Sequence, residues 1–512
     1  MVNRKPNLII ITSDQQRGDC YGFAGRAVKT PHLDIMARQG THFRNCITSS
    51  VVCQPSRAGI LTGLLPQTHG VWDNGVDLEE SVADKGFAGT LGRSGYRTAF
   101  IGKAHFTTMH AFEPTGAPEC ARSTDLYDKD WNGPYMGFQH VELVVMGHNR
   151  NPPMRPPFGQ HYDRWFYADG LGDWKWERYN TRTGPDANAA QTLQSGLPQA
   201  FHNSEWTANQ AIEYLRDRRD DDDPFALWIS FPDPHHPFDA PEPWSRLHHP
   251  DEVDLPHHRV RDLDRRPWWH KACLEGTPQL KDPKMFAHRA RNSRVPDQTD
   301  EQLRHIIANY YGMISLIDHN VGRIRNALRD YGLDDNTYVF YTSDHGDWLG
   351  DHGLLLKGPM LYEGLLTVGG LLVGPGVPAG HVVEDPVSTI DIPATLLDLA
   401  QAAPDANLHG KSLRPLWDSS TASRDFALNE WRLHPTRTGV ALDLKCVRAR
   451  HAKLTIDALS GAGEMYDLKE DPDEMHNIFD DPGKIALRRE LEAMLATRPD
   501  DRTSFREPVG MA

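Results

Sequence analysis

The sequence lacks several features that would assign it to a specialised class of protein. It has only six cysteines in 512 residues, and their scattered positions fit a reducing cytoplasm better than a disulfide framework. No stretch is apolar over the roughly 20 residues that a membrane-spanning helix needs. The apolar run Leu8–Ile11 is also too short for the core of a signal peptide. We therefore expect a cytoplasmic protein without a membrane anchor.

Positive charge is scarce relative to negative charge. The chain has 55 Lys and Arg residues against 70 Asp and Glu residues, a formal net charge of -15 at pH 7. A protein that binds nucleic-acid phosphates needs a basic surface, so this balance argues against a nucleic-acid partner. An anionic substrate would instead have to be held by a local basic pocket.

What the sequence does contain is an alternation of strand and helix patterns over its first four fifths. Buried strands are predicted at Asn7–Thr12, Tyr96–Ile101, Phe225–Phe231 and Thr337–Thr342, and helices at Pro31–Gln39 and Ser56–Leu65. Continuous β-branched and aromatic runs of this kind are typical of strands covered on both faces. The pattern predicts an α/β fold in which several strands are parallel.

The pattern changes near residue 420, where we place a domain boundary. Residues 1–420 are predicted to form the larger domain, with long irregular segments near 107–200 and 238–298. Such segments inside a compact domain commonly form lids or substrate walls. Residues 421–512 are predicted to form a small α+β domain, because short alternating segments such as Val440–Val447 precede a helix at Ile485–Leu495.

Each predicted buried strand is followed by polar side chains that can take part in chemistry. These residues are Asp14 and Gln15, Lys103 and His105, His235, and Asp344 with His345. A single Asp after a strand commonly caps a helix or forms a turn. Because the carboxyl ends of parallel strands share one edge, where ligands bind, two Asp residues at separate strand ends favour a metal site.

The most informative short motif is Cys53 Gln54 Pro55 Ser56 Arg57, followed by Leu61 Thr62 Gly63. A lone cysteine is commonly a small buried apolar residue. Here, however, the N-terminus of the predicted helix would face Cys53, and helix N-termini favour anions. Arg57 would lie one helical turn beyond Cys53 and could offer a forked, charge-assisted hydrogen bond there.

Together and in this order, these motifs resemble the type I formylglycine-dependent sulfatases, arylsulfatase-like members of the alkaline phosphatase superfamily. Lys357, and the segments Tyr466 Asp467 Leu468 and Asp471 Pro472 Asp473 Glu474, extend the resemblance over nearly the whole chain. It implies an alkaline-phosphatase-like α/β fold. In that fold a large mixed sheet is flanked by helices, and a smaller C-terminal domain holds an antiparallel sheet.

The resemblance also implies a modified nucleophile and a metal. A formylglycine-generating enzyme would convert Cys53 to formylglycine, whose hydrate attacks the substrate. The implied ligands of one divalent cation are Asp14, Gln15, the modified Cys53, Asp344 and His345. Gln15 and His345 replace the commoner Asp and Asn of the family. Oxygen donors favour Ca²⁺, our first expectation, and the imidazole makes Mn²⁺ the second.

The remaining roles follow from the same resemblance. Arg57 would brace the hydrated aldehyde, Lys103 would contact the sulfate and aldehyde oxygens, and His105 would take the proton of the second hydroxyl. His235 and Lys357 would bind the substrate on its leaving-group side, and either could protonate the departing oxygen. We leave His236, His352 and Asp347 unassigned.

The expected activity is hydrolysis of a small-molecule or saccharide sulfate monoester. A first alternative is the phosphonate monoester and phosphodiester hydrolase branch of the superfamily, which shares the Gln15 and His345 variants but has neutral hydroxyl residues where this chain has Lys103 and His105. A second alternative is an inactive relic that only binds sulfate esters. A homo-oligomer, in which a neighbouring subunit completes the lids, is a further expectation.

Overall fold

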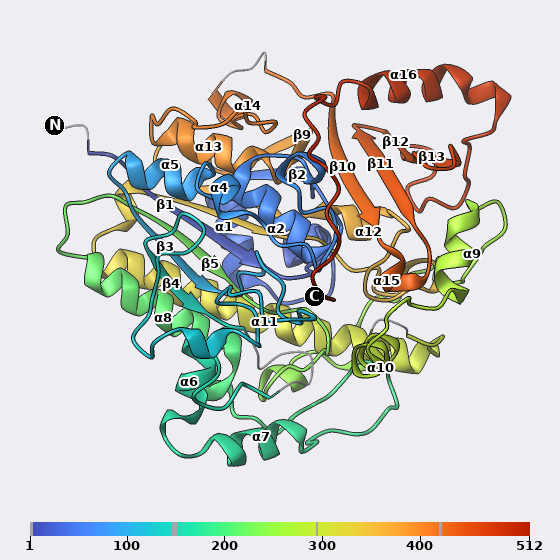
Figure 1. Ribbon diagram of the computed structural model, residues 1–512. Coiled ribbons are helices and arrows are strands. Elements are labelled where there is room, and N and C mark those ends of the chain that lie inside the picture. The colour runs from blue at the N-terminus through green and yellow to red at the C-terminus, as the bar shows by residue number, and fades with distance from the viewer. Residues whose placement is uncertain (1–3, 146–151, 293–294, 419–421, 512) are drawn as a thin grey trace.

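The computed structural model describes residues 4–145, 152–292, 295–418 and 422–511 (Figure 1). Within these residues, nine strands form a large sheet in the order β4-β3-β5-β1-β6-β8-β2-β7, with β9 paired to β2. The strands are β1 (Asn7–Ser13), β2 (Thr41–Ile47), β3 (Arg97–Gly102), β4 (His140–Leu143), β5 (Phe225–Ser230), β6 (Thr337–Ser343), β7 (Thr367–Val368), β8 (Gly370–Val373) and β9 (His381–Ser388).

The strands from β4 to β6 in this order are parallel, and the strands beyond β6 are mixed in direction. β1 lies between β5 and β6 and is parallel to both, and β3 and β4 continue the parallel part. β8 is antiparallel to β6, and β2 is antiparallel to β8. The carboxyl ends of β1, β3, β5 and β6 therefore meet at one edge, as predicted.

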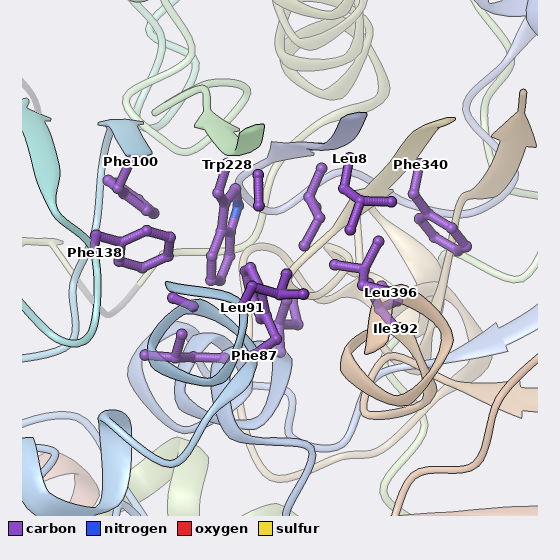
Figure 2. Close-up of a cluster of buried hydrophobic side chains, with 14 of the residues drawn as sticks. Leu8, Phe87, Leu91, Phe100, Phe138, Trp228, Phe340, Ile392 and Leu396 are labelled. Atoms are coloured by element: carbon purple, nitrogen blue, oxygen red, sulfur yellow. The ribbon is translucent and has the colours of Figure 1, made fainter. Parts of the chain in front are cut away.

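Helices cover both faces of the sheet because side chains along a strand alternate between its faces. Leu8 and Ile10 of β1 belong to a buried cluster that includes α2, α5 and α13, whereas Ile9 and Ile11 pack with α1, α8 and α11. Figure 2 shows Leu8 and Trp228 of the sheet above Leu91 of α5. These helices are α1 (Pro31–Gln39), α2 (Cys53–Thr62), α5 (Phe87–Arg93), α8 (Asn203–Arg218), α11 (Asp300–Asp330) and α13 (Asp391–Leu399).

Two predictions of local structure need correction. The helix expected at Ser56 begins at Cys53 itself. The segment 107–200 is also less irregular than expected, because residues 140–143 form the edge strand β4, which is held by pairing with β3 rather than by a local pattern. The segment 107–200 also contains the helices α6 (His161–Ala168) and α7 (Gly172–Asn180). The second segment expected to be irregular, 238–298, contains α9 (Trp268–Glu275) and α10 (Pro283–Asn292).

The C-terminal part forms an antiparallel sheet in the order β10-β11-β12-β13. Its elements are β10 (Phe426–Leu433), β11 (Leu442–Ala449), β12 (Ala452–Asp457), β13 (Gly463–Asp467) and the helix α16 (Ile485–Leu495). The prediction missed β10. The α/β class, the large mixed sheet and the small antiparallel sheet are confirmed, while the proposed limits at 420 and 421 stay a prediction.

Short helices complete the connections. They are α3 (Pro66–His69), α4 (Glu80–Ala83), α12 (Glu363–Leu366), α14 (Pro415–Asp418) and α15 (Pro435–Thr438). Among the described residues, no helix has both the length and the apolar character required to cross a bilayer.

The last residues run back from the small sheet over the larger part of the molecule, as the red trace toward the C-terminus in Figure 1 shows. Their backbone hydrogen bonds are Thr503 N to Gln67 O (2.8 Å), Val509 N to Gly75 O (2.7 Å), Phe112 N to Val509 O (2.8 Å) and Met511 N to His110 O (3.1 Å). The ring of Phe505 stacks on Trp72 with centroids 4.3 Å apart. Residues 503–511 therefore tie the two parts of the chain together.

Candidate active site

Several strand ends of the large sheet meet beside the first turn of α2. Asp14 follows β1, Lys103 follows β3 and Asp344 follows β6. Main-chain hydrogen bonds hold these ends in place: Asp14 N donates to Asp233 O at 2.8 Å and Lys103 N donates to Ser230 O at 2.9 Å. The parallel register thus brings together residues that are more than 300 positions apart.

Position 53 lies among these charged side chains. Cys53 is the first residue of α2 and is 1% exposed. Its Sγ is 3.0 Å from Lys357 Nζ and 3.1 Å from His345 Nε2. Burial and the charge of Asp14 act to raise the pKa of the Cys53 thiol. The positive charges of Lys357, His345 and Lys103 outweigh both and hold that pKa well below its usual range.

Arg57 contacts both carboxylates beside position 53. Its guanidinium is fully buried and donates from Nε to Asp344 Oδ2 (2.9 Å) and from Nη2 to Asp14 Oδ2 (3.3 Å). Its Nη1 donates to Lys103 O (2.6 Å) and to Ser230 Oγ (2.7 Å). Arg57 therefore braces the two carboxylates and the end of β3, while its role on the hydrated aldehyde stays a prediction.

Asp14 and Asp344 are fully buried but differ in charge environment. Burial acts to raise the pKa of Asp14, but the surrounding cations, Lys103 first, hold it well below its usual range. Lys103 Nζ forms an ion pair with Asp14 Oδ2. Burial, followed by the charge of Asp14, raises the pKa of Asp344. Asp344 Oδ1 accepts hydrogen bonds from the backbone N–H groups of Gln15 (3.0 Å) and His345 (2.9 Å).

The side chain of Gln15 is oriented by a residue that the sequence analysis left unassigned. Gln15 Nε2 donates to Asp347 Oδ2 at 2.6 Å and lies 3.4 Å from His236 Nδ1. Its Oε1 accepts a hydrogen bond of 2.9 Å from Lys357 Nζ. The amide oxygen therefore faces the same ammonium group that contacts Cys53.

The two remaining histidines lie at the margin of this network. His105 has a left-handed backbone with φ of 52°, and its N–H donates to the Glu119 side chain. Both ring nitrogens of His105 are buried without a hydrogen-bond partner among the described residues. The ring of His235 stacks on that of His236, with centroids 4.1 Å apart, and its Nδ1 lies 2.7 Å from His236 O.

Most of the predicted site residues therefore form one connected group. The directly linked residues are Asp14, Gln15, Cys53, Arg57, Lys103, Asp344, His345 and Lys357. His235 joins the group through its neighbour His236. The sequence analysis missed Ser230, Glu119 and the role of Asp347. Of these, only Asp347 had a signal, because it stands three residues after Asp344 in the same motif.

The donor set suits a divalent cation. Ligand atoms of Asp14, Cys53, Asp344 and His345 all lie within 4.8 Å of one another. The ammonium of Lys357 contacts Gln15 Oε1, Cys53 Sγ and His345 Nε2 at 2.9, 3.0 and 3.2 Å, so a positive charge is already accommodated among these donors. Carboxylate and amide oxygens with one imidazole are ligands of Ca²⁺ and Mn²⁺ sites. The residues therefore fit the implied metal.

The sequence matches two family profiles and a known arylsulfatase. A family profile described as "Sulfatase" matches residues 6–402, and one described as "N-sulphoglucosamine sulphohydrolase, C-terminal" matches residues 350–500. The arylsulfatase of Clostridium perfringens (strain 13 / Type A) is 29% identical over 500 residues, covering 93% of this chain and 90% of that protein.

Solved structures show the same fold. The phosphonate monoester hydrolase of Agrobacterium radiobacter superposes with a TM-score of 0.75 at 25% identity, over 98% of this chain and 100% of that one. A protein solved with its substrate D-glucosamine-2-N,6-O-disulfate superposes with a TM-score of 0.69 at 22% identity, over 96% and 97% of the two chains. Since the first profile spans more than half of the sequence, the chain belongs to the sulfatase family, a family of sulfuric ester hydrolases.

Proposed function

We propose that this protein hydrolyses sulfate monoesters with a formylglycine derived from Cys53 as nucleophile and one divalent cation. The observation that carries the proposal is the position of Cys53 at the start of α2, with His345 and Lys357 about 3 Å away and both buried aspartates beside it. A buried structural cysteine would not need cations on two sides. A formylglycine-generating enzyme is the transient partner that this proposal requires.

The divalent cation and the formylglycine would supply chemistry that unmodified side chains lack. The cation, held by Asp14, Gln15, Asp344, His345 and position 53, would polarise a sulfate oxygen and lower the pKa of the attacking hydroxyl. A hydrated aldehyde carries two hydroxyls on one carbon, so one can attack sulfur and loss of the proton from the other can expel sulfate and restore the aldehyde.

The side chains of the site would divide the remaining tasks. Lys103 and Lys357 would neutralise the non-bridging sulfate oxygens, because both ammonium groups lie at the same cluster. His105 would take the proton of the second hydroxyl, and its unpartnered ring nitrogens support this role. His235 or Lys357 would protonate the leaving oxygen. Arg57 would brace the hydrated aldehyde as well as the two carboxylates, and Asp347 would hold Gln15 in place.

The proposed substrate is a small-molecule or saccharide sulfate, held by Lys103, His235 and Lys357. A second candidate activity is hydrolysis of phosphonate monoesters, which is supported by the superposition on the Agrobacterium hydrolase and by Gln15 and His345 among the ligands. Lys103 and His105 favour sulfate, because they add two potential cations to the pocket. We also propose a cytoplasmic location, which the six free, buried cysteines support.

The test combines chemistry and kinetics. Protein made together with a formylglycine-generating enzyme is digested, and the Cys53 peptide is examined by mass spectrometry for the aldehyde. Rates are then compared on an aryl sulfate and a phosphonate monoester, with Ca²⁺ or Mn²⁺ returned after chelation. We expect conversion and preferential sulfate hydrolysis, both lost in Cys53→Ala. Equal turnover by Cys53→Ala would reject the nucleophile, faster phosphonate hydrolysis would favour the second candidate, and binding without turnover by converted protein would indicate a relic.

A further inference from the structure

A second cluster of metal-binding side chains lies outside the catalytic network. His257 and His258 belong to the segment before α9, and Asp473 belongs to the turn after β13. His257 Nε2 contacts Asp473 Oδ2, and His258 Nδ1 lies 3.5 Å from Asp473 Oδ1. The ligand atoms of all three residues lie within 4.8 Å of one another. One carboxylate therefore presents each of its oxygens to a different imidazole.

His258 is arranged as a metal-binding histidine would be. Its Nδ1 is buried and has no hydrogen-bond partner among the described residues. Its other ring nitrogen, Nε2, faces Asp351 Oδ1 at 3.3 Å. Asp351 is held in turn by Arg17, whose Nη1 donates to Asp351 Oδ2 at 2.7 Å. A carboxylate behind one imidazole nitrogen keeps the proton there and leaves the opposite nitrogen as a lone-pair donor.

The cluster borders a large open pocket that leaves room for further ligands. The pocket has a volume of about 870 Å³, and its walls include Arg17, His257, His258, Asp351, His352 and Asp473. Water in this space could complete the coordination of an ion, as it does at sites with three protein ligands. The ligands of this cluster are different residues from those of the catalytic cluster around Cys53.

We propose that His257, His258 and Asp473 form a Zn²⁺ site at the junction of the two parts of the chain. Two imidazoles and one carboxylate suit Zn²⁺, whereas Ca²⁺ takes six to eight oxygen ligands. Because the histidines and Asp473 are more than 200 residues apart, the ion would fasten the segment before α9 to the C-terminal domain. The competing arrangement is an ion pair between the same three side chains without a metal.

Zinc content measured after equilibrium dialysis against zinc chloride tests the proposal. The His257→Ala/His258→Ala double variant should bind one Zn²⁺ per chain fewer than the wild type, and zinc should raise the thermal midpoint of the wild type more than that of the variant. His249→Ala is the control, because His249 is also exposed and paired with an aspartate, Asp251. Any zinc at the catalytic site is common to all three proteins.

Folding of the variants is checked by circular dichroism and a cooperative thermal transition, which do not depend on enzymatic activity. Asp473→Asn provides a second route, because it keeps the shape of the side chain but weakens its donor oxygens. Equal zinc content in the wild type, the double variant and Asp473→Asn would overturn the proposed zinc site. The three side chains would then form only an ion pair. The same loss in His249→Ala would show that the difference is not specific.

Discussion

Asp347 anchors the amide of Gln15 with a hydrogen bond of 2.6 Å from Gln15 Nε2 to Asp347 Oδ2. The other carboxylate oxygen of Asp347 accepts from the N–H groups of Leu349 (2.7 Å) and Leu356 (3.0 Å). A carboxylate that accepts hydrogen bonds at both oxygens takes the NH₂ end of the amide, so Gln15 Oε1 points toward Lys357 and the proposed metal ligands. The buried carboxylate of Asp347 therefore determines that the oxygen of the Gln15 amide, and not its nitrogen, faces Lys357.

Removing this anchor should weaken metal binding. In Asp347→Ala the Gln15 amide loses its orientation, and we expect metal affinity to fall by about 10- to 100-fold, the usual cost of losing a partner behind a ligand. Activity should return at high metal concentration, which a lost catalytic group would not allow. Titrations of activity with Ca²⁺ and Mn²⁺ measure the effect. Asp405→Ala is the control, because it removes an exposed ion pair with Arg93. It should leave the Ca²⁺ and Mn²⁺ titration curves unchanged.

Removing the charge of Arg57 should destabilise the protein strongly. Arg57→Met keeps the length of the side chain but leaves Asp14 and Asp344 buried without their shared cation. Loss of one partner of a buried ion pair costs about 3 to 5 kcal/mol. Denaturant unfolding of chelator-treated protein measures this loss. The matched variant Arg44→Met removes an exposed pair with Glu384 and should cost less than about 1 kcal/mol. Similar losses in both would contradict the bracing role.

The C-terminal tail should support the first turn of α2, where Cys53 lies. Val509 N bonds Gly75 O, and Gly75 N donates to Gln54 Oε1 at 2.8 Å, directly beside position 53. Deleting residues 503–512 should lower the thermal midpoint and reduce kcat at least about tenfold, because small misplacements of reacting groups are costly. Phe505→Ala, which removes the ring that stacks on Trp72 and lies under the Arg432 guanidinium, should cost about 1 to 2 kcal/mol and leave kcat near the wild-type value. Wild-type kcat in the truncated protein would refute this coupling.

Stability should depend on pH through Asp318. Burial raises the pKa of this carboxyl from 3.8 to about 7, although its oxygens accept hydrogen bonds from the N–H groups of His32 (3.2 Å) and Leu33 (2.7 Å). The folded state then holds the proton more tightly than the unfolded state, so stability falls as pH rises from about 4 to about 7.

Asp318→Asn removes this titration and keeps one oxygen acceptor, so one of the two backbone N–H groups loses its partner at every pH. The stability of this variant relative to the wild type should therefore start lower but rise by about 2 to 3 kcal/mol between pH 5 and pH 8, given about 1.4 kcal/mol for each pKa unit. Denaturant unfolding of both proteins at the two pH values gives the comparison. A stability difference that does not change with pH would show that the carboxyl is not the titrating group.

Much of the fold could be predicted because its main elements carry local signals. The apolar run of β1 and the amphipathic pattern of α1 match the observed elements within one residue, and α16 matches at both ends. The strands β2, β4, β7, β8, β9 and β10 were not predicted. They are defined by pairing with other strands, as β4 is with β3 and β10 with β11, which a local pattern does not reveal.

For the site, the sequence by itself determined which residue types are present and their order, so the proposed metal ligands, Cys53 and the nearby cations could be named from motifs. Only the tertiary structure decided how they are used. It turned Arg57 toward two buried carboxylates, gave Asp347 the orientation of Gln15, and set His257 and His258 against Asp473. Most of these contacts join residues that are tens to hundreds of positions apart in the sequence. The direction in which each side chain points depends on the packed backbone, and the spacing of residues in the sequence does not encode it.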